Sequence, residues 1–183
     1  MATKKKVNVT INGVQVQVPE DYTVLLAARE AGIDIPTLCY LKDINEVAAC
    51  RLCVCEAEVN GRPMRNLPTS CVLKVEDGMV VRTDTPRVRK AVKMNLELIL
   101  ANHNRECLTC TRNQTCELQK LCHEMGIDME RFDGETRPVC YDDLSPSIVR
   151  DSSKCVLCGR CVSVCSKLQN LSVLEFVNRG ADT

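Results

Sequence analysis

The sequence predicts an α+β protein built from several small units that do not share one large core. Near the N-terminus, apolar and polar residues alternate as they do in short strands. In the middle, apolar residues recur at the spacing of an amphipathic helix. The 183 residues include 14 cysteines but no Trp, three Tyr and two Phe. Because large aromatic side chains usually supply much of a core's buried area, we expect cysteine chemistry to stabilise these units instead.

The first predicted elements are a hairpin and a helix. Residues 7–11 and 14–18 alternate apolar and polar side chains, and Asn12-Gly13 between them is a strong signal for a two-residue turn. Thr23 is a suitable N-cap for a helix that ends before Gly32.

Two further strands are expected at 54–59 and 79–83. A hairpin, a crossing helix and later strands make a β-grasp pattern, which we assign to a domain at residues 1–84. Its cysteine spacing, C-x10-C-x2-C-x17-C when Cys55 is left aside, has the logic of a [2Fe–2S] site, with three ligands on a loop and one on a distant segment.

A helical domain is predicted at residues 85–127. Thr85 and Pro86 are typical of a helix start, and apolar residues at helical spacing extend the helix to about residue 104. The motif H-x3-C-x2-C-x5-C begins with His103 at the end of this helix. A short helix that ends at Gly126 follows, and its spacing favours a packing role for Cys122.

A polar linker is predicted at residues 128–147, followed by a ferredoxin-like segment at 148–183. Cys140 lies in the linker, where we expect a loop thiol beneath neighbouring structure. The segment contains C-x2-C-x2-C-x3-C from Cys155 to Cys165, the spacing with which bacterial ferredoxins hold [4Fe–4S] clusters. Gly159 allows the tight curl that such a run requires.

Composition excludes several other classes of protein. No apolar run is long enough to span a membrane, and the N-terminus has no secretory h-region, so we expect a cytoplasmic protein. The sequence has no basic stripe with interleaved aromatic residues, so we do not expect it to bind nucleic acid. Thiols in a reducing compartment are more often metal ligands than disulfides. Zinc remains an alternative to iron–sulfur, since three cysteines and one histidine also suit it.

Three stretches carry a resemblance to a known family: IPTLCY…ACRLCVCEAEV…TSC, LELILANHNRECLTCTRNQTCELQ and SPSIVRDSSKCVLCGRCVSVC. Together they resemble the N-terminal iron–sulfur region of multi-cluster [FeFe]-hydrogenases, in particular the catalytic subunit of the NAD(P)-linked type, with electron bifurcation as an open alternative. The same stretches are similar to the large iron–sulfur subunit of complex I. The resemblance implies one [2Fe–2S] and two [4Fe–4S] clusters in this chain. Its implied ligands are Cys39, Cys50, Cys53 and Cys71 for the [2Fe–2S] cluster, His103, Cys107, Cys110 and Cys116 for one [4Fe–4S] cluster, and Cys155, Cys158 and Cys161 for the other.

The sequence leaves two alternatives for the cluster that Cys165 ligates. It is either the cluster of Cys155 or a second cluster, because the fourth cysteine of such a run ligates the other cluster in two-cluster ferredoxins. We therefore expect the chain to be part of a longer subunit. The alternative is a complete small protein whose third cluster takes Cys165 or Cys140 as its fourth ligand. Cys165 also favours the hydrogenase branch, because the complex I subunits have no cysteine at its place.

Where this family has an aliphatic residue, the chain has Cys55, which we expect to be a buried core residue.

The function implied by the resemblance is electron transfer. The chain would relay electrons between a flavin- and NAD(P)H-binding iron–sulfur partner and a hydrogenase or formate dehydrogenase active site located elsewhere. Other implied partners are a small thioredoxin-like [2Fe–2S] subunit and ferredoxin. No acid, base or nucleophile is assigned, so catalysis by these residues themselves is left open. The alternatives are an iron–sulfur subunit of a complex I-like NADH dehydrogenase and a zinc-stabilised structural subunit.

Overall fold

The computed structural model describes residues 5–129, 131–137 and 140–183, and the remaining residues, which include 130, 138 and 139 of the predicted linker, lie outside the described part. The chain divides into two compact units, Met1–Val92 and Lys93–Thr183.

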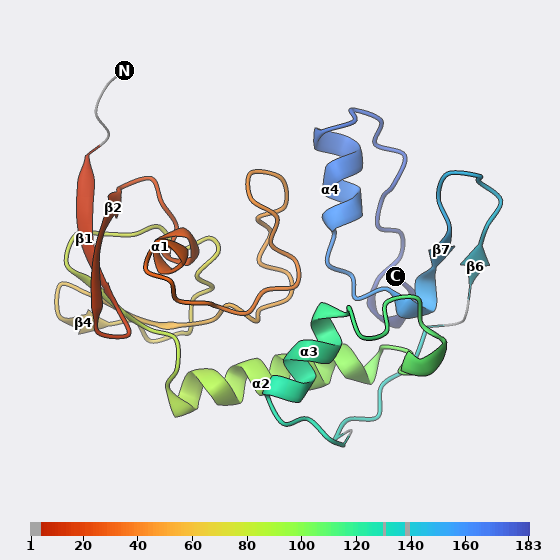
Figure 1. Ribbon diagram of the computed structural model, residues 1–183, viewed down its shortest axis with the longest axis horizontal. Helices are drawn as coiled ribbons and strands as arrows, with labels where there is room; N and C mark the ends of the chain where they lie inside the picture. The colour runs from red at the N-terminus through yellow and green to blue at the C-terminus, as the bar shows by residue number, and fades with distance from the viewer. Residues whose placement is uncertain (1–4, 130, 138–139) are drawn as a thin grey trace. The chain divides into compact units, whose positions relative to one another are not determined.

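The first unit contains a mixed five-stranded sheet with the order β2-β1-β5-β3-β4 (Figure 1). The strands are β1 (Lys6–Ile11), β2 (Val14–Pro19), β3 (Glu56–Val59), β4 (Arg62–Pro63) and β5 (Met79–Arg82). Strand β1 runs parallel to β5, and the other neighbours are antiparallel. This sheet and helix α1 (Val24–Glu30) confirm the α+β, β-grasp prediction.

Local signals explain the first elements of this unit. Asn12 and Gly13 both have positive φ, 50° and 85°, so the turn twists in the sense that a β1–β2 hairpin needs. The Thr23 hydroxyl accepts a hydrogen bond from the Leu26 backbone N–H at 3.3 Å and caps the start of α1. Gly32, just after the helix, has φ +71°, the left-handed conformation that commonly follows a helix C-terminus.

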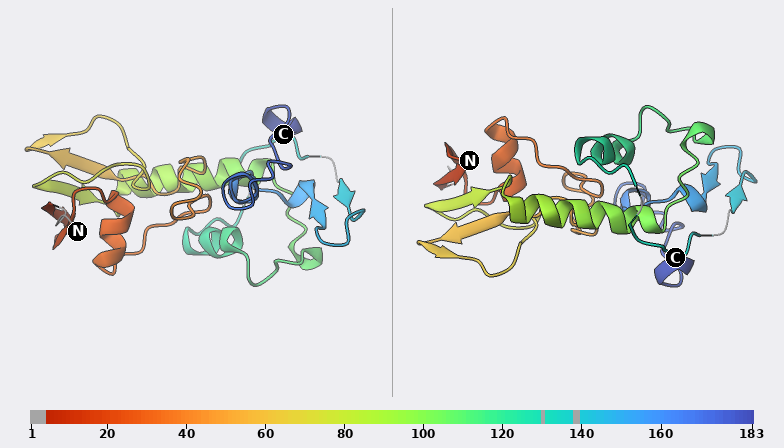
Figure 2. Two further views of the ribbon diagram at one scale, coloured as in Figure 1. Left: turned by 90° about the horizontal axis from the view of Figure 1, so that it is seen from above. Right: turned by 90° about the horizontal axis from the view of Figure 1, so that it is seen from below.

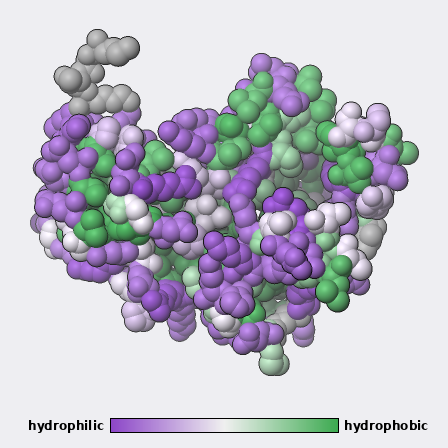
Figure 3. Space-filling model, viewed as in Figure 1, coloured by the Kyte–Doolittle hydropathy of each residue, from purple (hydrophilic) through white to green (hydrophobic). Residues whose placement is uncertain are grey.

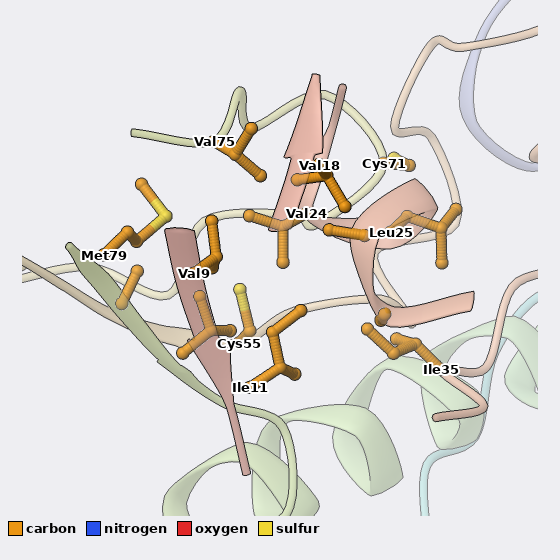
Figure 4. Packing of buried hydrophobic residues seen from close by; sticks show 14 of the residues in the cluster. Val9, Ile11, Val18, Val24, Leu25, Ile35, Cys55, Cys71, Val75 and Met79 are labelled. Carbon is orange, nitrogen blue, oxygen red and sulfur yellow. The ribbon is translucent and has the colours of Figure 1, made fainter. Parts of the chain in front are cut away.

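The core of the first unit lies between α1 and the sheet. Val24 and Leu25 of α1 pack with Val9 and Ile11 of β1, as Figure 4 shows, and all four are fully buried. Each such side chain contributes about 1.5–3 kcal/mol when it leaves water. Cys55 belongs to the same cluster. Apart from Tyr40, the side chains of this buried cluster are aliphatic or contain sulfur.

Helix α2 (Pro86–Ala101) is one continuous helix, and the division between the two units falls within it (Figure 2). Pro86 occupies its first position, where a missing N–H costs nothing, and the Thr85 hydroxyl accepts from the Val88 N–H at 3.2 Å. Val88, Val92 and Leu96 form its buried face. The helix ends at Ala101, two residues before His103, and so stops short of the predicted end near residue 104.

The second unit holds the remaining elements. They are the 3-10 turns η1 (Cys107–Thr109), η2 (Ser152–Lys154) and η3 (Gly180–Asp182), helices α3 (Glu117–Glu124) and α4 (Arg160–Lys167), and strands β6 (Tyr141–Asp142) and β7 (Arg150–Asp151). Helix α3 buries Leu118 and Leu121 on one face. The two-stranded β6–β7 ribbon, whose strands have only two residues each, was not predicted from the sequence.

The segment 131–137, part of the predicted linker, lies against the C-terminal end of α2. Asn102 donates its side-chain N–H to the Glu135 carbonyl at 2.7 Å. A Cβ atom on Gly134 would clash with the Ala101 carbonyl group, so glycine permits this close approach. Arg131 pairs with Glu97 of α2, a carboxylate that is only 6% exposed. The segment is therefore fastened to the helix that leads to His103.

Surface character also differs along the second unit. Apolar side chains gather around α4 and the segment that follows it (Figure 3), where Leu168, Leu171, Val173 and Val177 are each at least 59% exposed. Among the helices in the described part of the chain, none has the length and apolar character needed to cross a membrane.

Candidate iron–sulfur sites

The four cysteines of the first predicted ligand set form two hydrogen-bonded pairs of thiols in the first unit. The Cys39 thiol donates to Cys50 Sγ at 3.4 Å, and Cys71 donates to Cys53 in the same way. These bonds, above other effects, lower the pKa of Cys50 to about 5 and that of Cys53 to about 7. They raise the pKa of Cys39 and Cys71, and burial adds to that rise. One thiol of each pair therefore readily becomes a thiolate, the form that binds metal.

The loop around this set directs backbone groups toward sulfur. The Leu38 N–H donates to Cys50 Sγ at 3.5 Å. Asn45, 1% exposed, donates to the Cys39 carbonyl at 2.7 Å and fixes the loop from within. Arg51, between two cysteines of the set, has φ 56°, a left-handed conformation that is uncommon for a residue with a Cβ. The backbone thus curls around the sulfur atoms.

Cys55 has a different environment from its neighbours. Its side chain is 0% exposed, lies in the hydrophobic cluster of the first unit, and has Sγ 3.7 Å from the Pro68 carbonyl oxygen. Burial, followed by the charge of Cys53, raises the pKa of its thiol to about 12. A thiol that stays protonated in an apolar core serves packing, as expected from the sequence.

His103 lies just beyond α2 in the second unit, with one ring nitrogen unpartnered. Its Nδ1 is buried and has no hydrogen-bond partner among the described residues. Burial lowers the pKa of the imidazole, and the charges of Lys154, Arg137 and Arg105 lower it further. A neutral imidazole with a free nitrogen is the form that ligates metals. These properties fit the role predicted for His103.

Of the three cysteines predicted to join His103, Cys107 begins η1, Cys110 directly follows it, and Cys116 lies at the start of α3. Cys107 is exposed and the other two are partly buried. The Arg112 N–H donates to Cys110 Sγ at 3.4 Å, and Gln114 has φ 67°, so this loop also curls around sulfur. Cys122 of α3 is partly buried, and burial, followed by the charges of Cys116 and Cys107, raises the pKa of its thiol to about 11. Its protonated state favours packing over ligation.

The third run begins with the same backbone pattern. The Leu157 N–H donates to Cys155 Sγ at 3.4 Å, and Leu157 and Gly159 have φ 53° and 75°. Cys161 and Cys165 are one turn apart on α4, but Cys161 is exposed whereas Cys165 is 5% exposed.

Cys140 differs from its prediction, because its side chain is exposed rather than covered. Its carbonyl oxygen accepts the Ser152 N–H at 3.2 Å, so its backbone is fixed beside η2. This hydrogen bond involves the Cys140 backbone and not its thiol. The residue can therefore have a fixed backbone while its side chain stays exposed to solvent.

Within the described residues, no three His, Cys, Asp or Glu side chains converge closely enough to hold a metal ion as they stand. The donor chemistry nevertheless fits iron–sulfur clusters at each place. All three loops contain a backbone N–H that donates to sulfur and a non-glycine residue with positive φ, and such concave backbone binds Fe–S groups. The ligand assignments themselves stay predictions.

A set of polar residues between the second and third runs was not predicted from the sequence. Lys154 bonds to Asn104, and Arg137 bonds to the Cys155 carbonyl. Lys154 directly precedes a cysteine run and Asn104 directly follows the histidine, but no motif marks either residue. Only their position next to predicted ligands could have drawn attention to them.

Comparison with known proteins finds iron–sulfur families along the chain. Residues 4–86 match the family described as a 2Fe-2S iron-sulfur cluster binding domain. Residues 93–131 match the NADH-ubiquinone oxidoreductase-G iron-sulfur binding region, and residues 148–166 match a 4Fe-4S binding domain. The chain is 45% identical over 177 residues to the NADP-reducing hydrogenase subunit HndD of Solidesulfovibrio fructosivorans, covering 94% of this chain and 30% of that subunit. A solved chain of an NAD+-reducing [NiFe]-hydrogenase in the H2-reduced state aligns with a TM-score of 0.85 and 30% identity, over 96% of this chain and 72% of its own length.

The chain belongs to the iron–sulfur family shared by NAD(P)-linked hydrogenases and the large iron–sulfur subunit of complex I. Another relative is the NADH-ubiquinone oxidoreductase 75 kDa subunit of Reclinomonas americana, 34% identical over 97% of this chain and 25% of that subunit. The chain thus spans 25% to 30% of the length of these two curated relatives. The family confirms the predicted [2Fe–2S] and [4Fe–4S] character of the chain. Because the solved relative is a [NiFe] enzyme, the family is not restricted to the [FeFe] type that the sequence suggested.

Proposed function

We propose that this chain is an electron relay that receives electrons from a flavin- and NAD(P)H-binding partner and passes them to a hydrogen- or formate-handling active site on another part of the complex. One observation carries the proposal: a [2Fe–2S] region and two [4Fe–4S] regions follow one another in a single chain of 183 residues. Several clusters in one small chain have no evident use in isolation, whereas a series of them provides steps for electrons.

When bound, the clusters supply reversible one-electron transfer at potentials set by their surroundings. The residues of this chain hold and tune them. Thiolates of the three predicted sets provide the ligands, and His103 replaces one thiolate by a neutral group. The N–H groups of Leu38, Arg112 and Leu157 donate to ligand sulfur, which stabilises negative charge and raises the potential. No proton transfer or nucleophilic attack is required of any residue.

The relatives are named as subunits, so association with other chains is part of the proposal. We propose a flavin- and NAD(P)H-binding iron–sulfur subunit and a small thioredoxin-like [2Fe–2S] subunit as partners, with ferredoxin as a further electron carrier. A cytoplasmic location is proposed because all 14 cysteines are free thiols, which a reducing compartment preserves.

A second candidate function is that of the large iron–sulfur subunit of a complex I-like dehydrogenase. It is favoured by the match of residues 93–131 to the NADH-ubiquinone oxidoreductase-G iron-sulfur binding region. The two candidates share the relay chemistry and differ in the acceptor. The presence of Cys165 favours the hydrogenase branch.

The test is the iron and acid-labile sulfide content of anaerobically purified chain. We expect about 10 irons per chain if the [2Fe–2S] site and both [4Fe–4S] sites fill, and about 6 if the Cys155 run stays empty. The relay proposal also requires that a NADH- or NADPH-linked flavoprotein partner reduce the clusters. Bleaching of the visible absorbance measures this reduction. Zinc in place of iron would overturn the relay and support a structural subunit.

A further inference from the structure

Lys154 connects the loop after His103 to the start of the third cysteine run. Its Nζ donates to Asn104 Oδ1 at 3.0 Å, to the Glu106 carbonyl at 3.2 Å and to the Asn104 carbonyl at 3.5 Å. The Asn104 backbone N–H donates in turn to the Ser153 carbonyl at 3.2 Å. The residue before Cys155 is therefore fastened to the residue after His103.

Arg137 makes a second connection in the same unit. Its side chain is 9% exposed, and Nη1 donates to the Cys155 carbonyl at 2.5 Å. Its Nε is buried and has no hydrogen-bond partner within the described part of the chain. The segment that carries Arg137 is attached to the end of α2 through the bond from Asn102 to Glu135. Arg137 thus also spans from the His103 end of the helix to the Cys155 backbone.

Among the described residues, the hydrogen bonds of both cations go to neutral acceptors. Lys154 bonds to carbonyl and amide oxygens, and Arg137 bonds to a carbonyl oxygen. A buried guanidinium is costly unless opposite charge lies near it. The nearby ligand sets are sources of negative charge, because ligating thiols are deprotonated. Lys154 bonds to Asn104, the residue that directly follows His103, so its charge lies next to a predicted ligand in the chain.

We propose that Lys154 and Arg137 form a cationic brace, which fixes the His103 loop against the Cys155 run and favours the reduced state of the His103-containing [4Fe–4S] site. This inference rests on the proposed function. Hydrogen bonds give the brace its positioning role, and positive charge gives it the tuning role. Both are roles for residues that act through the ligands and not as ligands.

Lys154→Gln tests the tuning role by removing the charge while leaving an amide donor. Anaerobic redox titration, followed by the electron paramagnetic resonance signal of the His103-containing cluster, measures the ratio of reduced to oxidised cluster at a fixed potential. We expect this ratio to fall about threefold, a modest change because Lys154 is partly exposed and solvent partly screens its charge. A threefold change corresponds to roughly 28 mV for a one-electron couple. Lys154→Arg should restore the wild-type ratio. The matched control is Lys90→Gln, an exposed lysine on α2 in the first unit, which should leave the ratio unchanged.

Hydrogen exchange tests the positioning role without any metal. The Asn104 amide, bonded to the Ser153 carbonyl, should exchange faster in Lys154→Gln and in Arg137→Gln than in wild type and in Lys90→Gln. Unchanged exchange at Asn104 would overturn the brace as a positioning element. Unchanged potential in a Lys154→Gln protein with wild-type iron content would overturn the tuning role.

The two proposals fail in different ways. If the wild-type chain takes up zinc and no iron, the relay fails, and the exchange of the Asn104 amide still decides whether the brace exists. If the wild-type chain holds its clusters but neither variant changes exchange or potential, the brace fails and the relay stands.

Discussion

Cys55→Ala separates the packing role of Cys55 from ligation more sharply than any other single change in the first unit. The thiol is 0% exposed and surrounded by the core cluster, so the change removes one buried sulfur atom and leaves a small cavity. The lost transfer free energy is about 0.8 kcal/mol, as for a methylene, and the cavity raises the cost to about 1–2 kcal/mol. For a unit that spans Met1–Val92 this corresponds to a midpoint lowered by roughly 4–16 °C.

Two assays are read together. Anaerobic thermal unfolding of the metal-free chain gives the stability change, and visible absorption with iron analysis gives the [2Fe–2S] content. We expect Cys55→Ala to be less stable but to hold the same iron as wild type, whereas the matched Cys53→Ala variant should lose the [2Fe–2S] cluster. Loss of the [2Fe–2S] iron in Cys55→Ala, with Cys53→Ala still loaded, would refute both the ligand set and the interpretation of the core.

Three further predictions concern the helices and the second unit. His103→Cys adds a thiolate to its site and should lower the midpoint potential of that cluster, on the order of 100 mV, in a spectroscopically monitored redox titration; identical spectra and potential would show that the histidine is not a ligand. Thr23→Ala removes the cap of α1 and should lower the free energy of unfolding by about 1 kcal/mol in urea denaturation, while Thr10→Ala on β1 serves as the control outside the cap. Gly134→Ala places a methyl group against the Ala101 carbonyl and should destabilise the second unit by about 1–3 kcal/mol in thermal unfolding, whereas an unchanged midpoint would show that segment 131–137 does not pack on α2.

Local chemistry accounts for the parts of the fold that the sequence predicted well. The Asn12-Gly13 turn and the Thr23 cap act within a few residues of their own position, so the amino-acid pattern alone places the hairpin and α1. The [2Fe–2S] and [4Fe–4S] character of the chain could be predicted for a similar reason, since ligand spacing is written directly in the sequence.

Features that depend on distant residues were not predicted. The parallel pairing of β1 with β5 joins segments that are far apart in the sequence, such as Val9 with Met79, and no local signal encodes it. The bonds from Lys154 to Asn104 and from Arg137 to the Cys155 carbonyl likewise join distant segments, and neither motif specifies lysine, asparagine or arginine at these positions. Exposure of the Cys140 thiol depends on a main-chain bond to Ser152, which the linker composition does not reveal.

The left-handed residues in the cysteine loops have a consequence for how this sequence can change over evolutionary time. Arg51, Gln114 and Leu157 each have φ between 53° and 67° within one of the three runs. A residue with a Cβ has a cost of about 1–2 kcal/mol in this conformation, and β-branched side chains are the least compatible with it. Drift at these three positions should therefore be confined to glycine, asparagine and side chains that are not branched at Cβ, and valine, isoleucine and threonine should be absent there. Neighbouring positions that face solvent, by contrast, are free to vary without disturbing the loops.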